Sequence, residues 1–144
     1  MSYKPLQKTT EVSLLKLNAS ATIATGDYLN LTSDVAGIAG QTISGGNTLN
    51  LPAGHYLVEV SCGLDRTAYS DFLTYRCEVN GALEGTLGAM DSTGSGNYSF
   101  TVDQAGCATS QDATWTLKIK VVSCTASAWT AQSDYSYLLI TRVY

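Results

Sequence analysis

The side chains that could do chemistry in this sequence are one histidine, four cysteines and twelve carboxylates. His55 directly follows a Pro-Ala-Gly turn, and no G-x-S-x-G motif supplies a nucleophilic serine for it. No two acids stand out as the general acid and base of a glycosidase. We therefore predict that the protein is not an enzyme, and that His55 is an ordinary residue at the end of a strand.

The four cysteines contain no C-x-x-C pair and no spacing typical of a zinc site. Residues 91–96 resemble an acidic calcium loop but hold a single carboxylate, whereas calcium takes about six to eight oxygen ligands. We expect no metal and no cofactor. In a reducing cytoplasm the cysteines are expected to be free, buried hydrophobes; the alternative is a disulfide formed after release, with Cys62 and Cys77 as the candidate pair.

The elements that position these groups are predicted by alternation of apolar and polar residues. Residues 55–62, 72–80 and 114–123 each place apolar side chains on one face and polar ones on the other, which is typical of half-buried strands. Asn80-Gly81 indicates a tight hairpin turn, because both central residues of a type I′ turn need positive φ. No segment shows helical periodicity.

Weaker patterns predict the remaining boundaries. We expect strands over 12–17, 21–31 and 97–103, a loop over 104–113, and a closing strand over 134–144. Eight or more short strands at this spacing favour an all-β fold, an antiparallel two-sheet jelly-roll sandwich. At 144 residues the chain suits one domain, which we place at 12–144 behind an N-terminal arm, 1–11.

Composition limits the partners. A net charge of −4 and no basic cluster argue against a nucleic-acid partner, and no apolar run approaches the ~20 residues of a membrane-spanning helix. The chain also lacks a secretory signal pattern, so we expect it to be made in a cytoplasm. Only 14% of residues are charged, and nine tyrosines accompany two phenylalanines. Such a surface is typical of a protein that packs against other subunits.

The N-terminal arm carries two lysines and no acid before Glu11. An arm of this kind is suited to docking on an acidic partner surface, although a frayed terminus is an equally good interpretation. The residues that would dock are Tyr3, Lys4, Pro5, Leu6 and Lys8.

Several of these features together resemble one family. The segment 51–60 (LPAGHYLVEV), the Asn80-Gly81 turn, the aromatic strand from Tyr98 and the last strand, 137–143, resemble the C1q/TNF-like jelly-roll domains of bacteriophage virions. The resemblance implies a homotrimer on the exterior of a capsid. It carries no catalytic residue over. For the trimer interface we expect the C-terminal group Tyr135, Tyr137, Leu139 and Tyr144.

Two functions fit that resemblance. In the first, the trimer is a capsid decoration, or cement, protein that binds the major capsid protein and stabilises the shell. In the second, it is the receptor-binding tip of a tail or head fibre, where Trp129 could stack on a host glycan or contact a host surface protein. The short arm favours decoration, because a fibre tip usually follows a longer shaft.

Overall fold

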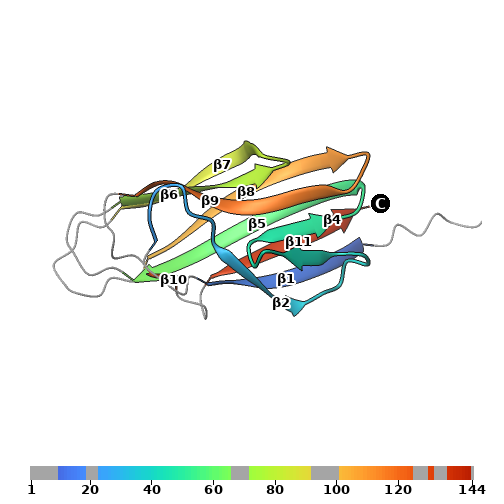
Figure 1. Cartoon of the computed structure of the whole chain (residues 1–144), viewed down its shortest axis with the longest axis horizontal. Coiled ribbons are helices and arrows are strands. Elements are labelled where there is room, and N and C mark those ends of the chain that lie inside the picture. Colours follow the sequence, from blue (N-terminus) through green and yellow to red (C-terminus); the bar gives the residue numbers. More distant parts are fainter. Residues whose placement is uncertain are drawn as a thin grey trace, which may run out of the picture.

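The computed structural model describes residues 10–18, 23–65, 72–91, 101–124, 130–131 and 136–143. These residues form eleven strands (Figure 1). In chain order they are β1 (Thr10–Asn18), β2 (Asn30–Val35), β3 (Thr42–Ser44), β4 (Thr48–Leu51), β5 (Gly54–Asp65), β6 (Phe72–Val79), β7 (Ala82–Asp91), β8 (Thr101–Gln111), β9 (Trp115–Cys124), β10 (Thr130–Ala131) and β11 (Tyr137–Val143). The structure thus places Thr10 and Glu11, assigned above to the arm, in the first strand.

The strands form two packed sheets that share one strand. One sheet has the order β2-β1-β11-β5-β8, with β10 also paired to β5; we call it the β5 sheet. The other has the order β7-β6-β9-β4-β3, and we call it the β9 sheet. The two sheets meet at β7, which pairs with β6 along most of its length and with β8 at Thr86. The predicted all-β antiparallel sandwich is confirmed.

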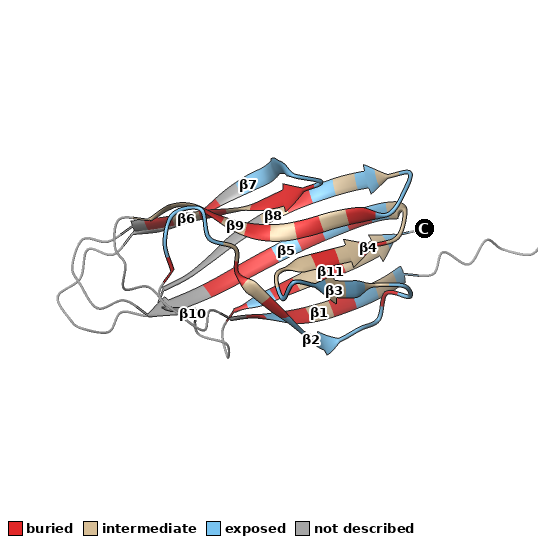
Figure 2. Cartoon of the chain, viewed as in Figure 1, coloured by how far each residue is buried: buried red, intermediate tan, exposed pale blue. Residues whose placement is uncertain are grey.

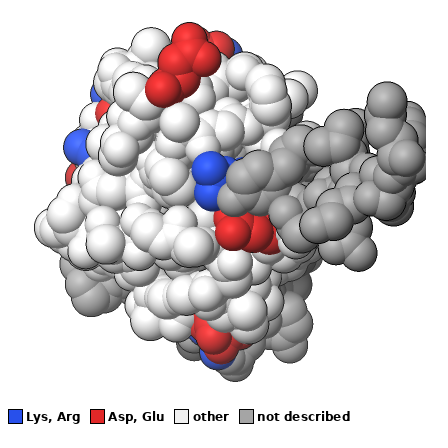
Figure 3. Space-filling view, turned by 90° about the vertical axis from the view of Figure 1, so that its right-hand side faces the viewer, with Lys and Arg blue, Asp and Glu red and all other residues white. Residues whose placement is uncertain are grey.

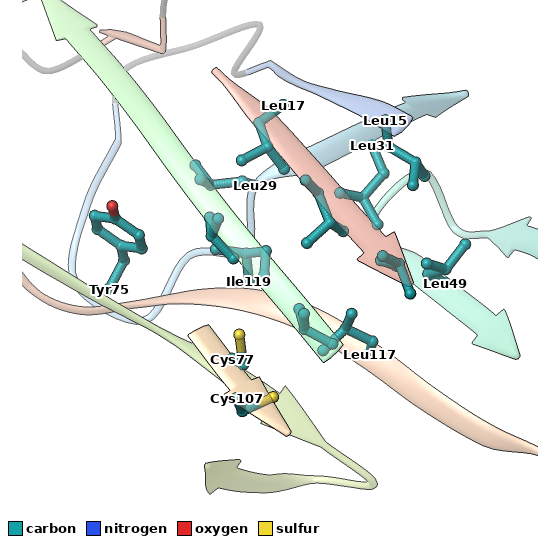
Figure 4. Close-up of a cluster of buried hydrophobic side chains, with 14 of the residues drawn as sticks. Leu15, Leu17, Leu29, Leu31, Leu49, Tyr75, Cys77, Cys107, Leu117 and Ile119 are labelled. Carbon is teal, nitrogen blue, oxygen red and sulfur yellow. The ribbon is translucent and has the colours of Figure 1, made fainter. Parts of the chain in front are cut away.

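Alternation along the strands produces the core between the sheets (Figures 2 and 4). In β5, Tyr56, Val58, Val60 and Cys62 are buried, whereas His55, Leu57 and Glu59 are exposed. The same period of two gives the inward residues of β9, of which Trp115 packs edge-on against Tyr56 with ring centroids 5.0 Å apart. The fully buried side chains from the other strands are Leu15, Leu17, Leu49, Leu51, Tyr75, Cys77, Leu138 and Ile140.

The Pro-Ala-Gly turn is held by the core rather than by its own residues alone. The Tyr56 hydroxyl donates to the Pro52 carbonyl at 2.7 Å, and the Arg142 guanidinium donates to the Ala53 carbonyl at 2.6 Å. Arg142 also pairs with Glu11 at 3.2 Å. Because these contacts join β1, β5 and β11, the turn fixes the start of β5 against its neighbours.

Two predicted boundaries were wrong. Among the described residues of 21–31, the chain enters a strand only at Asn30; before it, residues 26–29 hydrogen-bond to β9, as in Gly26 N to Val121 O at 2.9 Å. The predicted loop over 104–113 is instead strand β8 as far as Gln111. The small residues of this segment do not show the alternation typical of a strand. Gly106 has no room for a side chain, because a Cβ there would lie 2.7 Å from the Val58 carbonyl oxygen.

The candidate disulfide between Cys62 and Cys77 is not formed. All four cysteines are free thiols in the structure. Cys62 is on β5 opposite Asp103, whereas Cys77 is on β6 and its thiol hydrogen-bonds to Cys107 of β8. Cys62, Cys77 and Cys107 are buried, as expected of small hydrophobes, and Cys124 is half-buried.

Candidate interaction surface

On the outward face of the β5 sheet, apolar side chains lie in rows across four strands together with a few polar residues. One row follows the strand register from β1 to β8 through Val12, Thr141, Leu57 and Ala108. The neighbouring row runs through Leu14, Leu139, Glu59 and Gly106. Cross-strand neighbours of this kind have Cβ atoms about 5 Å apart, so each row is a continuous strip. We call the outward residues of β1, β11, β5 and β8 together the β5 face.

Large apolar side chains on this face remain in contact with solvent. Leu57 is 46% exposed, Val12 and Val143 are each 42% exposed, and Tyr137 is 38% exposed. Single exposed apolar residues are common on soluble proteins, but four on one sheet face are the kind of patch that marks an interaction site.

Two grooves follow the β5 face. The first lies between β11, β5 and β7 and is lined by residues that include Glu59, Thr86, Gly106, Tyr137 and Leu139. The second lies at the start of β5 and is lined by His55, Leu57, Ala108, Ser110 and Val143 among others. The first groove is lined mainly by polar groups, with Tyr137 and Leu139 as its large apolar members, whereas the lining of the second groove is mainly apolar.

The structure places two of the four predicted interface residues on this face. Tyr137 and Leu139 project from β11 into the first groove. Tyr135 and Tyr144 lie outside the described residues. So do Trp129 and the whole proposed docking set of the arm, Tyr3, Lys4, Pro5, Leu6 and Lys8.

The sequence reasoning missed three exposed members of the face: Leu57, Val12 and Val143. Leu57 carried a usable signal, because it is apolar in a phase of β5 otherwise made of His55 and Glu59. A leucine on the polar side of a half-buried strand indicates either a second packing partner or an exposed patch. Val143 shares the outward phase of β11 with Tyr137 and Leu139, so the apolar residues of that phase were a signal for it. Val12 had none, since the phase of β1 that faces outward depends on the sheet it joins.

His55 makes one contact on the β5 face. Its Nδ1 lies 2.7 Å from the Ser110 hydroxyl, and the pair is exposed. Within the described part of the chain no carboxylate pairs with this ring, so the group that orients the base in a Ser-His-Asp triad is missing from the arrangement seen there. The absence of enzyme activity stays a prediction.

The outward face of the β9 sheet differs, because several of its charged side chains form one network. The Tyr28 hydroxyl donates to Glu78 at 2.9 Å, and Lys120 lies 3.8 Å from the same carboxylate oxygen. The Lys118 ammonium sits 4.6 Å from the centroid of the Tyr28 ring. This network satisfies its polar groups internally, so the β5 face is the better candidate for a partner surface.

Charged groups are sparse at the end of the molecule where β5 begins. Figure 3 shows this end as mostly uncharged surface with a few small groups of Lys, Arg, Asp and Glu. A search of the described residues finds no cluster of three or more His, Cys, Asp or Glu side chains suited to a metal ion. In the same residues, no helix has the length and apolar character needed to cross a bilayer.

Comparison with solved structures identifies the fold. A structure of Eiger TNF from S. frugiperda matches with a TM-score of 0.65 at 14% identity, over 94% of this chain and 93% of that one. A murine APRIL structure at pH 5.0 matches with a TM-score of 0.66 at 10% identity, over 92% and 99%. The chain has a TNF-like jelly-roll fold. At these identities the likeness concerns the TNF-like fold alone, and no family model or curated protein sequence matches the chain.

Proposed function

We propose that the protein assembles through its β5 face into a homotrimer, and that the trimer is a virion structural protein that decorates the outer surface of a capsid. The observation that carries the proposal is the exposed apolar strip on the β5 face, with Leu57 at its centre. The trimeric state is supported by the TNF-like fold, for which trimers are typical.

The β5 face is large enough to form the main part of such an interface. Five strands at about 4.8 Å spacing and the seven residues of β11 at about 3.3 Å each give a flat area of roughly 550 Å². Side chains that project from the sheet increase this area toward the ~800 Å² that each partner buries in a specific complex. When a face binds a different surface of the next copy, the contact is heterologous, and a three-fold rotation between copies closes three of them into a ring.

Decoration is supported by the sparse charge of the chain and by the place where the arm begins. Thr10, the first described residue, pairs with Val143 at the end of β11. The basic arm therefore leaves the domain beside the second groove of the β5 face. In the proposal, the arm contacts acidic positions of the major capsid protein while the three domains pack together above it.

Assembly is tested by comparing two matched variants, Leu57→Asp and Leu83→Asp. Leu57 is 46% exposed on the β5 face, whereas Leu83 is 38% exposed and pairs with Glu78 on the β9 sheet. Light scattering should give three times 15.2 kDa for the unmodified chain and for Leu83→Asp. Leu57→Asp should weaken assembly about 30-fold or more, because an aspartate would be buried at the centre of the contact.

A monomeric unmodified chain at high concentration would overturn the trimer. Loss of assembly in both variants to the same extent would show that the effect does not belong to the β5 face. Far-ultraviolet circular dichroism of each variant establishes that it is folded.

The place in the virion is tested by quantitative mass spectrometry of purified particles. Copy numbers in the hundreds, on the capsid, support decoration. A handful of copies located on the tail would contradict it and support the fibre-tip function instead.

A further inference from the structure

Strand β7 joins the two sheets at a bulge that contains Gly85. Glu84 pairs with Cys77 of β6 in the β9 sheet, and Thr86 pairs with Gly106 of β8 in the β5 sheet. Gly85, between them, has φ of +73°, a conformation that favours glycine. The register with β6 shifts here, as in a β-bulge. This corner brings Cys77 and the residue after Gly106, Cys107, to either side of Gly85.

The two cysteines contact each other inside the corner. The Cys77 and Cys107 side chains are joined by a hydrogen bond, and Figure 4 shows them beside one another on β6 and β8. A disulfide across facing sheets needs this proximity, because its two Cβ atoms must come within about 4.5 Å. Cys62 also interacts electrostatically with Cys77, and the test below distinguishes the two partners.

Only a glycine backbone covers Cys107 at this corner. An ideal Cβ placed on Gly85 would lie 2.5 Å from the Cβ of Cys107, so no side chain fits between them. Cys107 is 8% exposed, whereas Cys62 and Cys77 are fully buried. A small reagent therefore reaches Cys107 before it reaches Cys62 or Cys77.

The hydrogen bond also shifts the pKa values of the two thiols in opposite directions. The hydrogen bond that Cys77 donates lowers the pKa of Cys107, although burial and the nearby Glu84 carboxylate act to raise that pKa. The same hydrogen bond, together with burial, raises the pKa of the Cys77 thiol. Since the thiolate is the nucleophile in thiol chemistry, the accessible sulfur is also the more reactive one.

We propose that Cys107 and Cys77 are a thiol pair that closes to an inter-sheet disulfide when the protein meets a small organic disulfide. The Cys107 thiolate attacks one sulfur of the reagent, forms a mixed disulfide and releases one equivalent of reagent thiolate. Cys77 then loses its proton to solvent and attacks the Cys107 sulfur, which releases the second equivalent. Two protein thiols are thereby oxidised by two electrons, and one reagent disulfide is reduced to two thiols.

The cross-link would join β6 to β8 directly. It closes a loop over residues 77–107, which includes the β6–β7 turn and the corner itself. Closure of a loop of this size restricts the unfolded chain, so thermal unfolding of the oxidised protein should shift upward by about 5 °C or more. The inference does not depend on the trimer or on the capsid.

The test uses the full chain under native conditions with bis(2-hydroxyethyl) disulfide as the probe. Peptide mapping without reduction should recover a Cys77–Cys107 cross-linked peptide. The Cys62→Ser variant should still form the cross-link. The Cys77→Ser variant should stop at the mixed disulfide between Cys107 and one half of the reagent. An adduct on the half-buried Cys124 is distinguished by its mass and is not a cross-link.

Either of two results on the unmodified chain would overturn the proposal: an unmodified Cys77–Cys107 pair after prolonged treatment, or a cross-link that contains Cys62. Because both are read from the unmodified chain, the test remains decisive even if a serine variant fails to fold.

Discussion

Ser13 is a fully buried hydroxyl on β1 that holds the loop following β2. Its oxygen accepts hydrogen bonds from the backbone N–H groups of Gly37 and Ile38, each at 3.0 Å, and it donates to the Gln41 side chain. The loop comes close enough that a Cβ on Gly37 would collide with the Val12 carbonyl. Ser13→Ala removes the acceptor while leaving both donors in place.

The loss of stability in Ser13→Ala can be estimated from the polar groups that lose a hydrogen-bond partner. The hydrogen bond to Ile38 is buried, and its loss leaves a buried N–H without an acceptor, which costs about 1–3 kcal/mol. The bonds to Gly37 and Gln41 are partly buried, and water can replace each of them at a net cost of about 0.5–1 kcal/mol. We expect the free energy of unfolding to fall by about 2–5 kcal/mol.

The assay is urea unfolding at one fixed subunit concentration, since assembly would otherwise change the apparent stability. Ser44→Ala is the matched control, because that hydroxyl is exposed and accepts one bond from Asn50 at 3.0 Å. The control should change stability by less than about 0.5 kcal/mol. Equal effects of the two variants, or a loss below about 0.5 kcal/mol for Ser13→Ala, would refute the reasoning.

Two further changes test packing and polar contacts by the same assay. Gly88→Ala should destabilise the protein by about 1–3 kcal/mol, because its new methyl group meets the ring of the fully buried Tyr75; no loss would mean that this ring can move. Tyr28→Phe should cost about 1–2 kcal/mol by removing the 2.9 Å hydrogen bond to Glu78, which is 7% exposed. An unchanged urea midpoint would show that Lys120 alone satisfies that carboxylate.

The parts of the fold that the sequence predicted are those with clean alternation or specific turn chemistry. The strands over 55–62 and 114–123 agree with β5 and β9, because large apolar residues in one phase must face a core. Asn80 and Gly81 have φ of 49° and 84°, as a type I′ turn requires. Strand β8 was missed because its small residues reflect the close approach of β5 and β7, which is a property of the folded sandwich.

The candidate surface was only partly predictable for a related reason. Tyr137 and Leu139 could be proposed because β11 is apolar in both phases, which indicates contacts on both sides. The remainder of the β5 face depends on which strands become neighbours, and pairs such as Thr141 with Leu57 are far apart in the sequence. The contact between Cys77 and Cys107 could not be predicted, because the sequence predicts an ordinary return strand where Gly85 forms a bulge.

The corner at Gly85 also connects the thiol pair to the proposed interface. Thr86 and Gly106 line the first groove of the β5 face, and the Thr86 hydroxyl binds both the N–H and the carbonyl of Gly106, at 2.9 and 3.1 Å. A subunit seated in that groove would hold the backbone that covers Cys107. Cross-linking should therefore slow as the unmodified chain assembles with rising concentration, whereas in Leu57→Asp its rate should not change with concentration. A rate independent of concentration in both proteins would mean that the corner opens equally well inside the assembly.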